Sequence, residues 1–512
     1  MLFNSYEFVL VFLPLTFLGY WLLSSIGRTT ALWWLALASL FFYSWWNPVY
    51  LPLLLASLLF NYVVGLRLSQ GGTGTRKLLI FGIAVDLALL FYYKYSFFVV
   101  STVEMALDLG FRPHPIILPL AISFYTFQKI GYLVDSWRGQ TRDYRFTHYL
   151  LFVTFFPQLI AGPIVHHKEV VPQFLKGDRF RPQARQLAIG LTIFTIGLFK
   201  KVVLADGIAV YANAIFHEAA SGRPLDFFLA WCGSLTYTLQ LYFDFSGYSD
   251  MAIGLGWLFG VRLPINFDSP FRSSSLAEFW RRWHITLSRF LKQYVYIPLG
   301  GSRVGETRAY LNVFLTMFLS GIWHGAGWTY LVWGIYNGVI VVFNRAWERL
   351  RKRLGWAQPR AWWDRGVAVA LTLVAWTAGL TIFRADSMAT ANNILAGMAG
   401  LHGAVLPQHW QAALAPFAAV FDALHIGFVN APIMLTYKVI AWIAVLGTIT
   451  LALPNIYQWL DHEQPVLREQ RFEAPPARQW RPSLMWVLLV MTLAAGALLS
   501  MSQVSEFLYF QF

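Results

Sequence analysis

Cysteine is nearly absent from this sequence, and charged residues are scarce. The 512 residues include a single cysteine, Cys232, which excludes an internal disulfide, a CxxC motif and a cysteine-based zinc cluster. Only 12% of the residues are charged, whereas 57% are hydrophobic. That proportion leaves too few polar side chains to cover large water-soluble domains. We therefore expect lipid to be the solvent for much of the chain.

The sequence also lacks a long polar block, because apolar stretches recur from Leu10 to Met501. A helix needs about 20 mostly apolar residues to cross the hydrocarbon layer. The pattern predicts an all-α integral membrane protein of about 11 to 13 helices, some of them short, tilted or re-entrant. Residues 1–512 are expected to form a single polytopic membrane domain, with a catalytic core at about residues 115–346. The candidate spans are 5–24, 30–46, 49–66, 78–100, 115–131, 146–163, 186–213, 226–243, 309–322, 325–346, 366–383, 433–453 and 483–501.

The excess of basic residues does not indicate nucleic-acid binding. The formal charge is +14, yet lysines and arginines lie in short loops between apolar stretches and form no extended basic arm. The basic connection between Arg345 and Arg365 is typical of a cytoplasmic loop, whereas the stretch from Asp386 to Ala431 has no Lys or Arg and is expected outside. These patterns predict the lipid bilayer, and no nucleic acid, as a partner.

One histidine interrupts an apolar stretch, His324 in FLSGIWHGAGWTYLVWG. Ionisable side chains inside a span are costly, so each is a hypothesis for function; the alternative is a histidine satisfied by a nearby carbonyl, and for an isolated histidine the two readings have about equal weight. Gly321, Gly325 and Gly327 favour function, because glycines let a ligand or another backbone approach the imidazole closely. A buried, neutral imidazole is suited to act as a general base.

A cluster of cations surrounds His284 in SLAEFWRRWHITLSRFLKQYVYIPLGGSR, which we read as a helix beginning at Ser275. Arginine binds phosphate with paired hydrogen bonds, so these cations would hold the phosphates of a donor such as coenzyme A. The alternative is an amphipathic helix whose basic side chains snorkel at the membrane surface. The candidate donor-binding residues are Arg281, Arg282, Arg289 and Lys292.

Two further motifs carry polar side chains in apolar surroundings. LQLYFDFSGYSDMAIGLG places Asp244 and Asp250 inside an apolar run, where hydroxyls or the arginines would have to partner them, and we favour a structural network that shapes a cavity. The other motif places Asp135 before the adjacent His166 and His167. Adjacent histidines cannot both face one metal from a helix, so we predict no metal site.

The order and spacing of these motifs closely resemble the membrane-bound O-acyltransferase (MBOAT) family, in particular its bacterial AlgI-like branch of alginate and exopolysaccharide O-acetyltransferases. The family's invariant histidine falls on His324 and its second polar position on His284, which is Asn in many eukaryotic members. Together with the opening MLFNSYEFVLVFLPL, the resemblance covers nearly the whole chain. It is carried by SFYTFQKIGYLVDSWRG, FPQLIAGPI, LYFDFSGYSDMAIGLG, EFWRRWHITLSRFLKQYVYIPLGG, GIWHGAGWTYLVWG and the terminal FLYFQF.

The resemblance implies a helical bundle around a central funnel or tunnel, with His324 and His284 as catalytic residues near its base. It implies an O-acetyltransferase of the bacterial inner membrane that passes an acetyl group from cytoplasmic acetyl-CoA to a periplasmic acceptor, for an exopolysaccharide such as alginate. Acetyl-CoA would be the acyl-donor substrate, with no permanently bound cofactor, and a periplasmic SGNH-type acetyltransferase would be a partner. Two alternatives remain open: D-alanyl or other acyl transfer to a cell-envelope polymer, and a transporter or scaffold with proton-relay histidines.

Overall fold

The computed structural model describes residues 1–111, 113–141, 144–175, 181–356, 362–430, 435–471, 473–501 and 508. The terminal FLYFQF motif, apart from Leu508, lies outside these residues. The described chain is almost entirely helical, as its composition predicts. It folds into two compact units: Met1–Phe199, Ser246–Asn266 and Asn455–Phe512 form the first, and Lys200–Phe245 and Phe267–Pro454 form the second.

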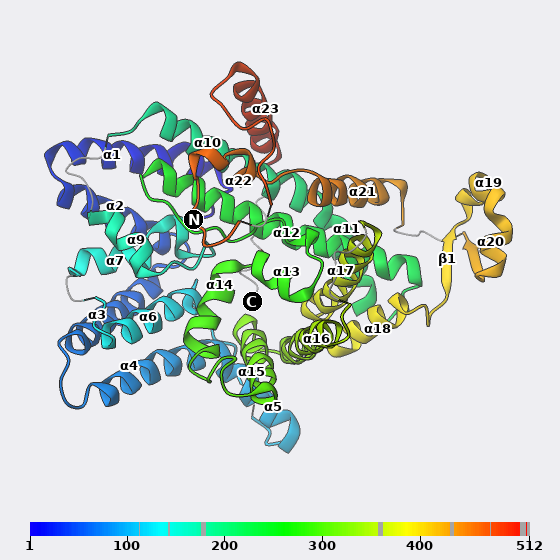
Figure 1. Ribbon diagram of the computed structural model, residues 1–512, viewed down its shortest axis with the longest axis horizontal. Helices are drawn as coiled ribbons and strands as arrows, with labels where there is room; N and C mark the ends of the chain where they lie inside the picture. Colours follow the sequence, from blue (N-terminus) through cyan, green and yellow to red (C-terminus); the bar gives the residue numbers. More distant parts are fainter. Residues whose placement is uncertain are drawn as a thin grey trace. The chain divides into compact units, whose positions relative to one another are not determined.

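The first unit holds most of the N-terminal helices (Figure 1). A π-helical turn, Glu7–Phe12, leads into α1, and helices α1 and α2 pack against each other, as do α3, α4 and α6. The C-terminal helix α23 returns to pack on α10. The helices are α1 Leu13–Ile26, α2 Arg28–Ser44, α3 Leu51–Ser69, α4 Thr75–Leu90, α5 Ser96–Leu107, α6 Ile122–Trp137, α7 Phe146–Thr154, α8 Phe156–Leu159, α9 His167–Leu175, α10 Ala184–Phe199, α22 Ile456–Trp459 and α23 Leu484–Ser500.

The second unit contains the antiparallel pair α15 and α16, which make the most extensive helix contact of the chain. Two short strands, β1 Ala404–Pro407 and β2 Ile426–Val429, pair in parallel in the connection before α21. The helices are α11 Asp206–Ala220, α13 Leu276–Arg282, α14 Ile285–Leu291, α15 Glu306–His324, α16 Trp328–Arg353, α17 Trp362–Arg384, α18 Met388–Met398, α19 Gln411–Leu414, α20 Ala418–Ala423 and α21 Tyr437–Ala452.

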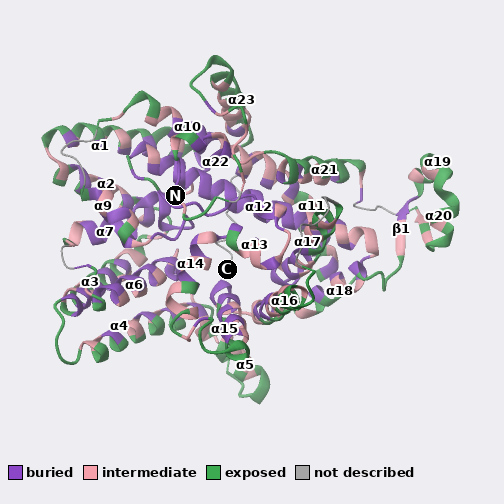
Figure 2. Cartoon of the chain, viewed as in Figure 1, coloured by how far each residue is buried: buried purple, intermediate pink, exposed green. Residues whose placement is uncertain are grey.

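Six helical stretches among the described residues are long and apolar enough to cross a membrane. They carry exposed apolar side chains on their outer faces (Figure 2), which suits lipid as solvent. The spans predicted at 309–322 and 325–346 form the longer helices α15 and α16, whereas the span expected at 146–163 is broken between α7 and α8 at Phe155. The six are Glu7–Ile26, Pro48–Ser69, Thr75–Leu107, Ala184–Ala220, Trp363–Arg384 and Tyr437–Glu463.

Helix α12, Phe227–Leu258, is longer than the span predicted at 226–243. It continues through the LYFDFSGYSDMAIGLG motif, where glycines would ordinarily weaken a helix. Glycine is needed at these positions because α12 packs closely against α10. A Cβ at Gly197 would lie 2.6 Å from the Gly247 carbonyl oxygen, and one at Gly254 would lie 2.6 Å from the Phe194 nitrogen. Tertiary contact between the two backbones therefore outweighs local helix propensity at this point of the chain.

The two carboxylates of that motif have different partners. Asp244 binds the ammonium of Lys201 at 2.7 Å, and the same ammonium binds Asp206 at 2.8 Å. Asp250 accepts a hydrogen bond from the Tyr457 hydroxyl at 2.5 Å. The ion-pair partner of Asp244 is therefore a lysine and not one of the expected arginines, and the hydroxyl that partners Asp250 comes from Tyr457, far along the chain from the motif.

The α10–α12 contact makes a prediction for stability. Replacing Gly197 with Ala puts a methyl group into the backbone of α12, and overpacking of this kind typically costs about 1–3 kcal/mol. We expect a lower melting temperature for Gly197→Ala in detergent. Gly447→Ala is the matched control, because nothing lies within 4 Å of a Cβ at that helical position. Equal melting temperatures for the two variants would contradict the packing argument.

Candidate functional site

His284 lies at a break between two helices of the second unit. Helix α13 ends at Arg282, Trp283 is extended, and α14 begins at Ile285. His284 itself has φ 43 and ψ 53, a left-handed conformation that is uncommon for residues other than glycine. The single helix predicted from Ser275 is therefore wrong at this point. Strained backbone of this kind persists only where the surroundings enforce it.

Aromatic rings enforce the position of His284. Its imidazole meets the ring of Phe245 edge-on at 4.8 Å and lies nearly parallel to Phe267 at 6.5 Å, both measured between centroids. The side chain is 1% exposed, and burial lowers the pKa of His284 to about 3. The imidazole is therefore neutral at physiological pH, a form in which one ring nitrogen donates and the other accepts a hydrogen bond.

His324 is the last residue of α15, and Gly321, Gly325 and Gly327 lie close to it along the chain. A Cβ at Gly321 would lie 2.5 Å from the Cα of Gly334 in α16, and one at Gly325 would lie 2.2 Å from the ring of Tyr330. Of the two roles predicted for these glycines, the close approach of another backbone is the one that the geometry supports. The imidazole is thus carried by one helix and held against the next.

Aromatic rings also surround His324, which is 7% exposed. Its ring centroid lies 4.9 Å from Trp323, 5.1 Å from Trp333 and 5.4 Å from Phe383. The ring of Trp323 is in turn 6.3 Å from His284. One indole therefore contacts both histidines, and the structure brings the two predicted catalytic residues into one aromatic cluster.

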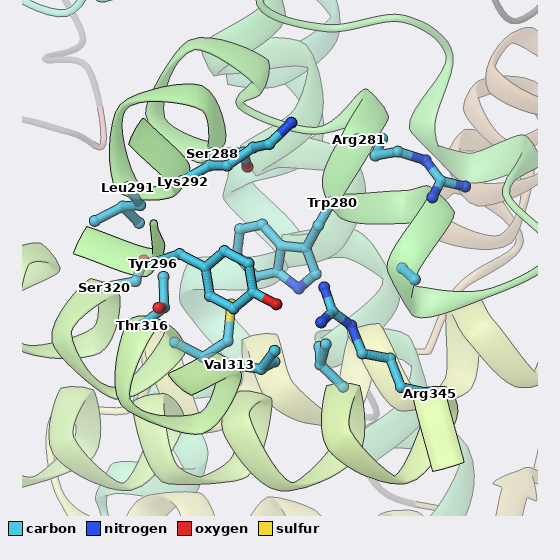
Figure 3. Close-up of a pocket in the computed structure, with 13 residues that line it drawn as sticks. Trp280, Arg281, Ser288, Leu291, Lys292, Tyr296, Val313, Thr316, Ser320 and Arg345 are labelled. Atoms are coloured by element: carbon cyan, nitrogen blue, oxygen red, sulfur yellow. The ribbon is translucent and has the colours of Figure 1, made fainter. Parts of the chain in front are cut away.

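A cavity opens beside this cluster, between α13, α14, α15 and α16. It holds about 290 Å³, and its walls are mostly apolar (Figure 3). Val313 and Val341 form part of one wall and pack with Leu276 in a small hydrophobic core. The lining residues are Ala277, Trp280, Arg281, Ser288, Leu291, Lys292, Tyr296, Val313, Thr316, Met317, Ser320, Val341 and Arg345.

Two of the four predicted donor-binding cations line the cavity. Arg281 and Lys292 are among its lining residues, and both are labelled in Figure 3. Arg282 is instead 2% exposed and binds Glu278 at 2.6 Å, one turn back on α13. Arg289 is not among the lining residues. The four cations are therefore not a single group.

The sequence analysis does not single out two polar residues that line the cavity. Arg345 of α16 reaches the cavity and stacks over the ring of Tyr296 at 5.9 Å, although the sequence indicates it only as part of a cytoplasmic loop. Ser320 is fully buried, and its hydroxyl has no hydrogen-bond partner within the described chain. Ser320 lies one turn before His324 on α15, and that spacing is a signal the sequence offers.

A second cluster joins Asp135 with His166 and His167 in the first unit. The Nε2 atoms of the two histidines lie 2.8 Å and 3.2 Å from Oδ2 of Asp135. Both rings can face one carboxylate because α9 begins at His167, so that His166 precedes the helix. The backbone N–H of Lys168 donates to Nδ1 of His166 at 3.2 Å, which leaves Nε2–H to donate to Asp135. The ligand atoms of Asp135, His166 and His167 lie within 4.8 Å of one another, so this group could hold a metal ion, and the argument from helical spacing against a metal is wrong here.

Comparison with known proteins adds independent information. A family profile described as MBOAT, membrane-bound O-acyltransferase family, matches residues 135–382, which include both histidines and the whole cavity. The chain is 43% identical to the peptidoglycan O-acetyltransferase of Helicobacter pylori over 79% of this chain and 81% of the relative. It is 41% identical to a probable alginate O-acetylase, AlgI, of Pseudomonas aeruginosa over 76% and 73% of the two chains.

Two further relatives show the range of these matches. The probable alginate O-acetylase AlgI of Pseudomonas putida is 36% identical over the full length of both chains. The teichoic acid D-alanyltransferase of Bacillus subtilis is 29% identical over 53% of this chain and 70% of its own length. The membrane-spanning helices, the buried histidines and these similarities lead to one conclusion: the chain belongs to the membrane-bound O-acyltransferase family and is an acyltransferase.

Proposed function

We propose that this enzyme moves an acetyl group from cytoplasmic acetyl-CoA across a bacterial inner membrane to a periplasmic acceptor, for O-acetylation of an exopolysaccharide such as alginate. The observation that carries the proposal is the cavity, whose mouth is basic and whose buried end lies one turn from His324. The three relatives named for O-acetylation of alginate or peptidoglycan match more of this chain than the D-alanyltransferase does. Acetyl is therefore favoured over D-alanyl as the group transferred.

The shape and chemistry of the cavity suit a thioester donor on a pantetheine arm. Arg281, Lys292 and Arg345 supply positive charge for its phosphates, and the apolar walls suit the arm itself. The basic end of α16 continues beyond Arg345 to a second hollow lined by Arg349, Lys352 and Arg353, which extends the positive surface. Phosphates at this mouth would leave the acyl end of the donor directed along α15 toward His324.

His324 is assigned as the general base of the transfer. It removes the proton of an acceptor hydroxyl, whose oxygen then attacks the thioester carbonyl carbon. The carbon–sulfur bond breaks, and the departing thiolate takes the proton back from His324. His284, neutral because it is buried, orients the donor or donates its N–H to the developing oxyanion. A covalent acyl-histidine is the alternative course for the same residues.

The acceptor side requires a partner outside the membrane. The connection from Asp386 to Ala431 contains no Lys or Arg and is assigned to the periplasm. A periplasmic SGNH-type acetyltransferase, which would take the acetyl group on to the polymer, is the partner proposed for that side. Mass spectrometry of acyl groups on secreted polymer, from cells with and without this chain, tests the overall function; unchanged acetylation would overturn it.

Replacing His324 with Ala removes the proposed base. General-base catalysis supplies roughly 10²- to 10⁴-fold, so we expect release of thiol from acetyl-CoA by the purified protein to fall by about that factor. His409→Ala, on the exposed 3₁₀ turn after β1, is the control and should behave as wild type. Turnover retained by His324→Ala would refute the assignment.

The cavity mouth predicts an effect that depends on the donor. Arg345→Gln should raise the KM for acetyl-CoA about tenfold, since one charge-assisted contact to phosphate is typically worth about 1.5–3 kcal/mol. It should leave the KM for S-acetyl-N-acetylcysteamine unchanged, because that thioester has no phosphate. Arg308→Gln, an exposed cation outside the cavity, serves as the matched control. An equal rise for both donors would show that Arg345 supports structure rather than phosphate binding.

Arg282 should behave differently from the cations at the mouth. Its guanidinium is buried and paired with Glu278, and removing one partner of a buried pair typically costs about 3–5 kcal/mol. We expect Arg282→Gln to lower the melting temperature strongly, and folded enzyme to keep its KM for acetyl-CoA. A raised KM for acetyl-CoA with an unchanged melting temperature would show that Arg282 binds the donor.

A further inference from the structure

The donor cavity stops short of His324. Ser320 is the lining residue nearest to His324 along α15, and the step of four residues from one to the other corresponds to about 6 Å of helix rise. His324 is not among the residues that line the cavity. A donor in the cavity therefore has to extend past other side chains to reach the imidazole of His324.

Aromatic side chains occupy the intervening space. The indole of Trp280 lines the cavity, and its centroid lies 6.1 Å from that of Trp333. The indole of Trp333 then meets the His324 imidazole at 5.1 Å with an interplanar angle of 87°. Phe383 closes the group, 5.1 Å from Trp333 and 5.4 Å from His324. Trp333 thus contacts both the cavity wall and the proposed base.

Trp333 has little freedom to move aside. It is 2% exposed, and the next residue, Gly334, provides the backbone contact with Gly321 of α15. Because no side chain separates the two helices there, the backbone of Trp333 is held at a fixed distance from the helix that carries His324. Close-packed interiors of this kind do not expand to admit extra methylene groups without cost.

We propose that Trp333 is the residue that limits the length of the acyl group accepted by this enzyme. The proposal rests on the proposed function, in that a thioester enters the cavity with its acyl end leading. To lie against His324, the acyl group has to part the contact between Trp280 and Trp333. Because Trp333 has little freedom to move, only a small acyl group can do so. An acetyl group adds one methyl to that space, whereas a butyryl group adds two further methylenes that the indole of Trp333 excludes.

The test compares acyl donors of different length in purified protein. Rejection of one methylene by an apolar pocket is typically worth roughly 10- to 200-fold, so Trp333→Ala should raise the butyryl-CoA to acetyl-CoA ratio of kcat/KM at least about tenfold. Trp333→Phe keeps an aromatic ring and should shift the ratio less, in the same direction. It also covers the case in which the alanine variant does not fold.

Trp376→Phe is the matched control. Trp376 is equally buried and packs 5.5 Å from Trp280, but its other ring contacts are with Phe279 and Trp283 on the side of α13. Loss of a buried indole there should affect stability without changing the ratio. A ratio unchanged in Trp333→Phe and Trp333→Ala, or raised equally in Trp376→Phe, overturns the proposal.

Failure of the proposed function gives a different result. If wild-type protein does not release thiol from acetyl-CoA, the donor assignment is wrong. The effect of Trp333 on acyl length is then measured in cells. The ratio of longer acyl groups to acetyl on secreted polymer, measured by mass spectrometry, then compares Trp333→Phe with wild type whatever the donor. Incorporation of longer acyl groups by the variant supports the role of Trp333, and an unchanged profile overturns it.

Discussion

The close approach of α15 and α16 at Gly321 and Gly334 is the contact on which the site depends. A Cβ at Gly321 would lie 2.5 Å from Gly334, so even an alanine would force the helices apart. Because the backbones touch there, Trp333 reaches His324 from the facing helix, and Ser320 and Val341 can line the same cavity. The close approach of the two helices thus sets how near Trp333 and the cavity lie to His324.

Charge is scarce in this chain, and three of its buried cations are held by carboxylates. Lys129 binds Asp86 at 2.8 Å, Lys201 binds Asp244, and Arg282 binds Glu278. An unpaired charge in these surroundings would cost several kcal/mol, so each pair fixes the helices that carry it. The cations at the cavity mouth differ in this respect, because they line a space where the charge of a ligand could offset their own.

The apolar stretches of the sequence predict the helical membrane fold. His324 is predicted as a candidate catalytic residue, because an ionisable residue in an apolar run is unusual wherever it occurs. The sequence also indicates Arg281 and Lys292 as candidate donor-binding residues, because they are cations close to His284 along the chain. It does not predict the break at His284, since no Gly or Pro marks it and the rings that enforce it come from Phe245 and Phe267. The role of Arg345 is hidden for a related reason: it reaches the cavity only through the folding of α16 against α15.

The left-handed backbone at His284 restricts what evolution can place there. Outside glycine, this conformation is tolerated best by Asn, Asp and His, whose short polar side chains avoid the steric penalty met by branched or bulky ones. Asn is the residue that many eukaryotic members of the family carry at this position. The main-chain torsion angles at position 284 therefore favour side chains that can donate or accept a hydrogen bond, and a bulky apolar replacement there would meet a steric penalty.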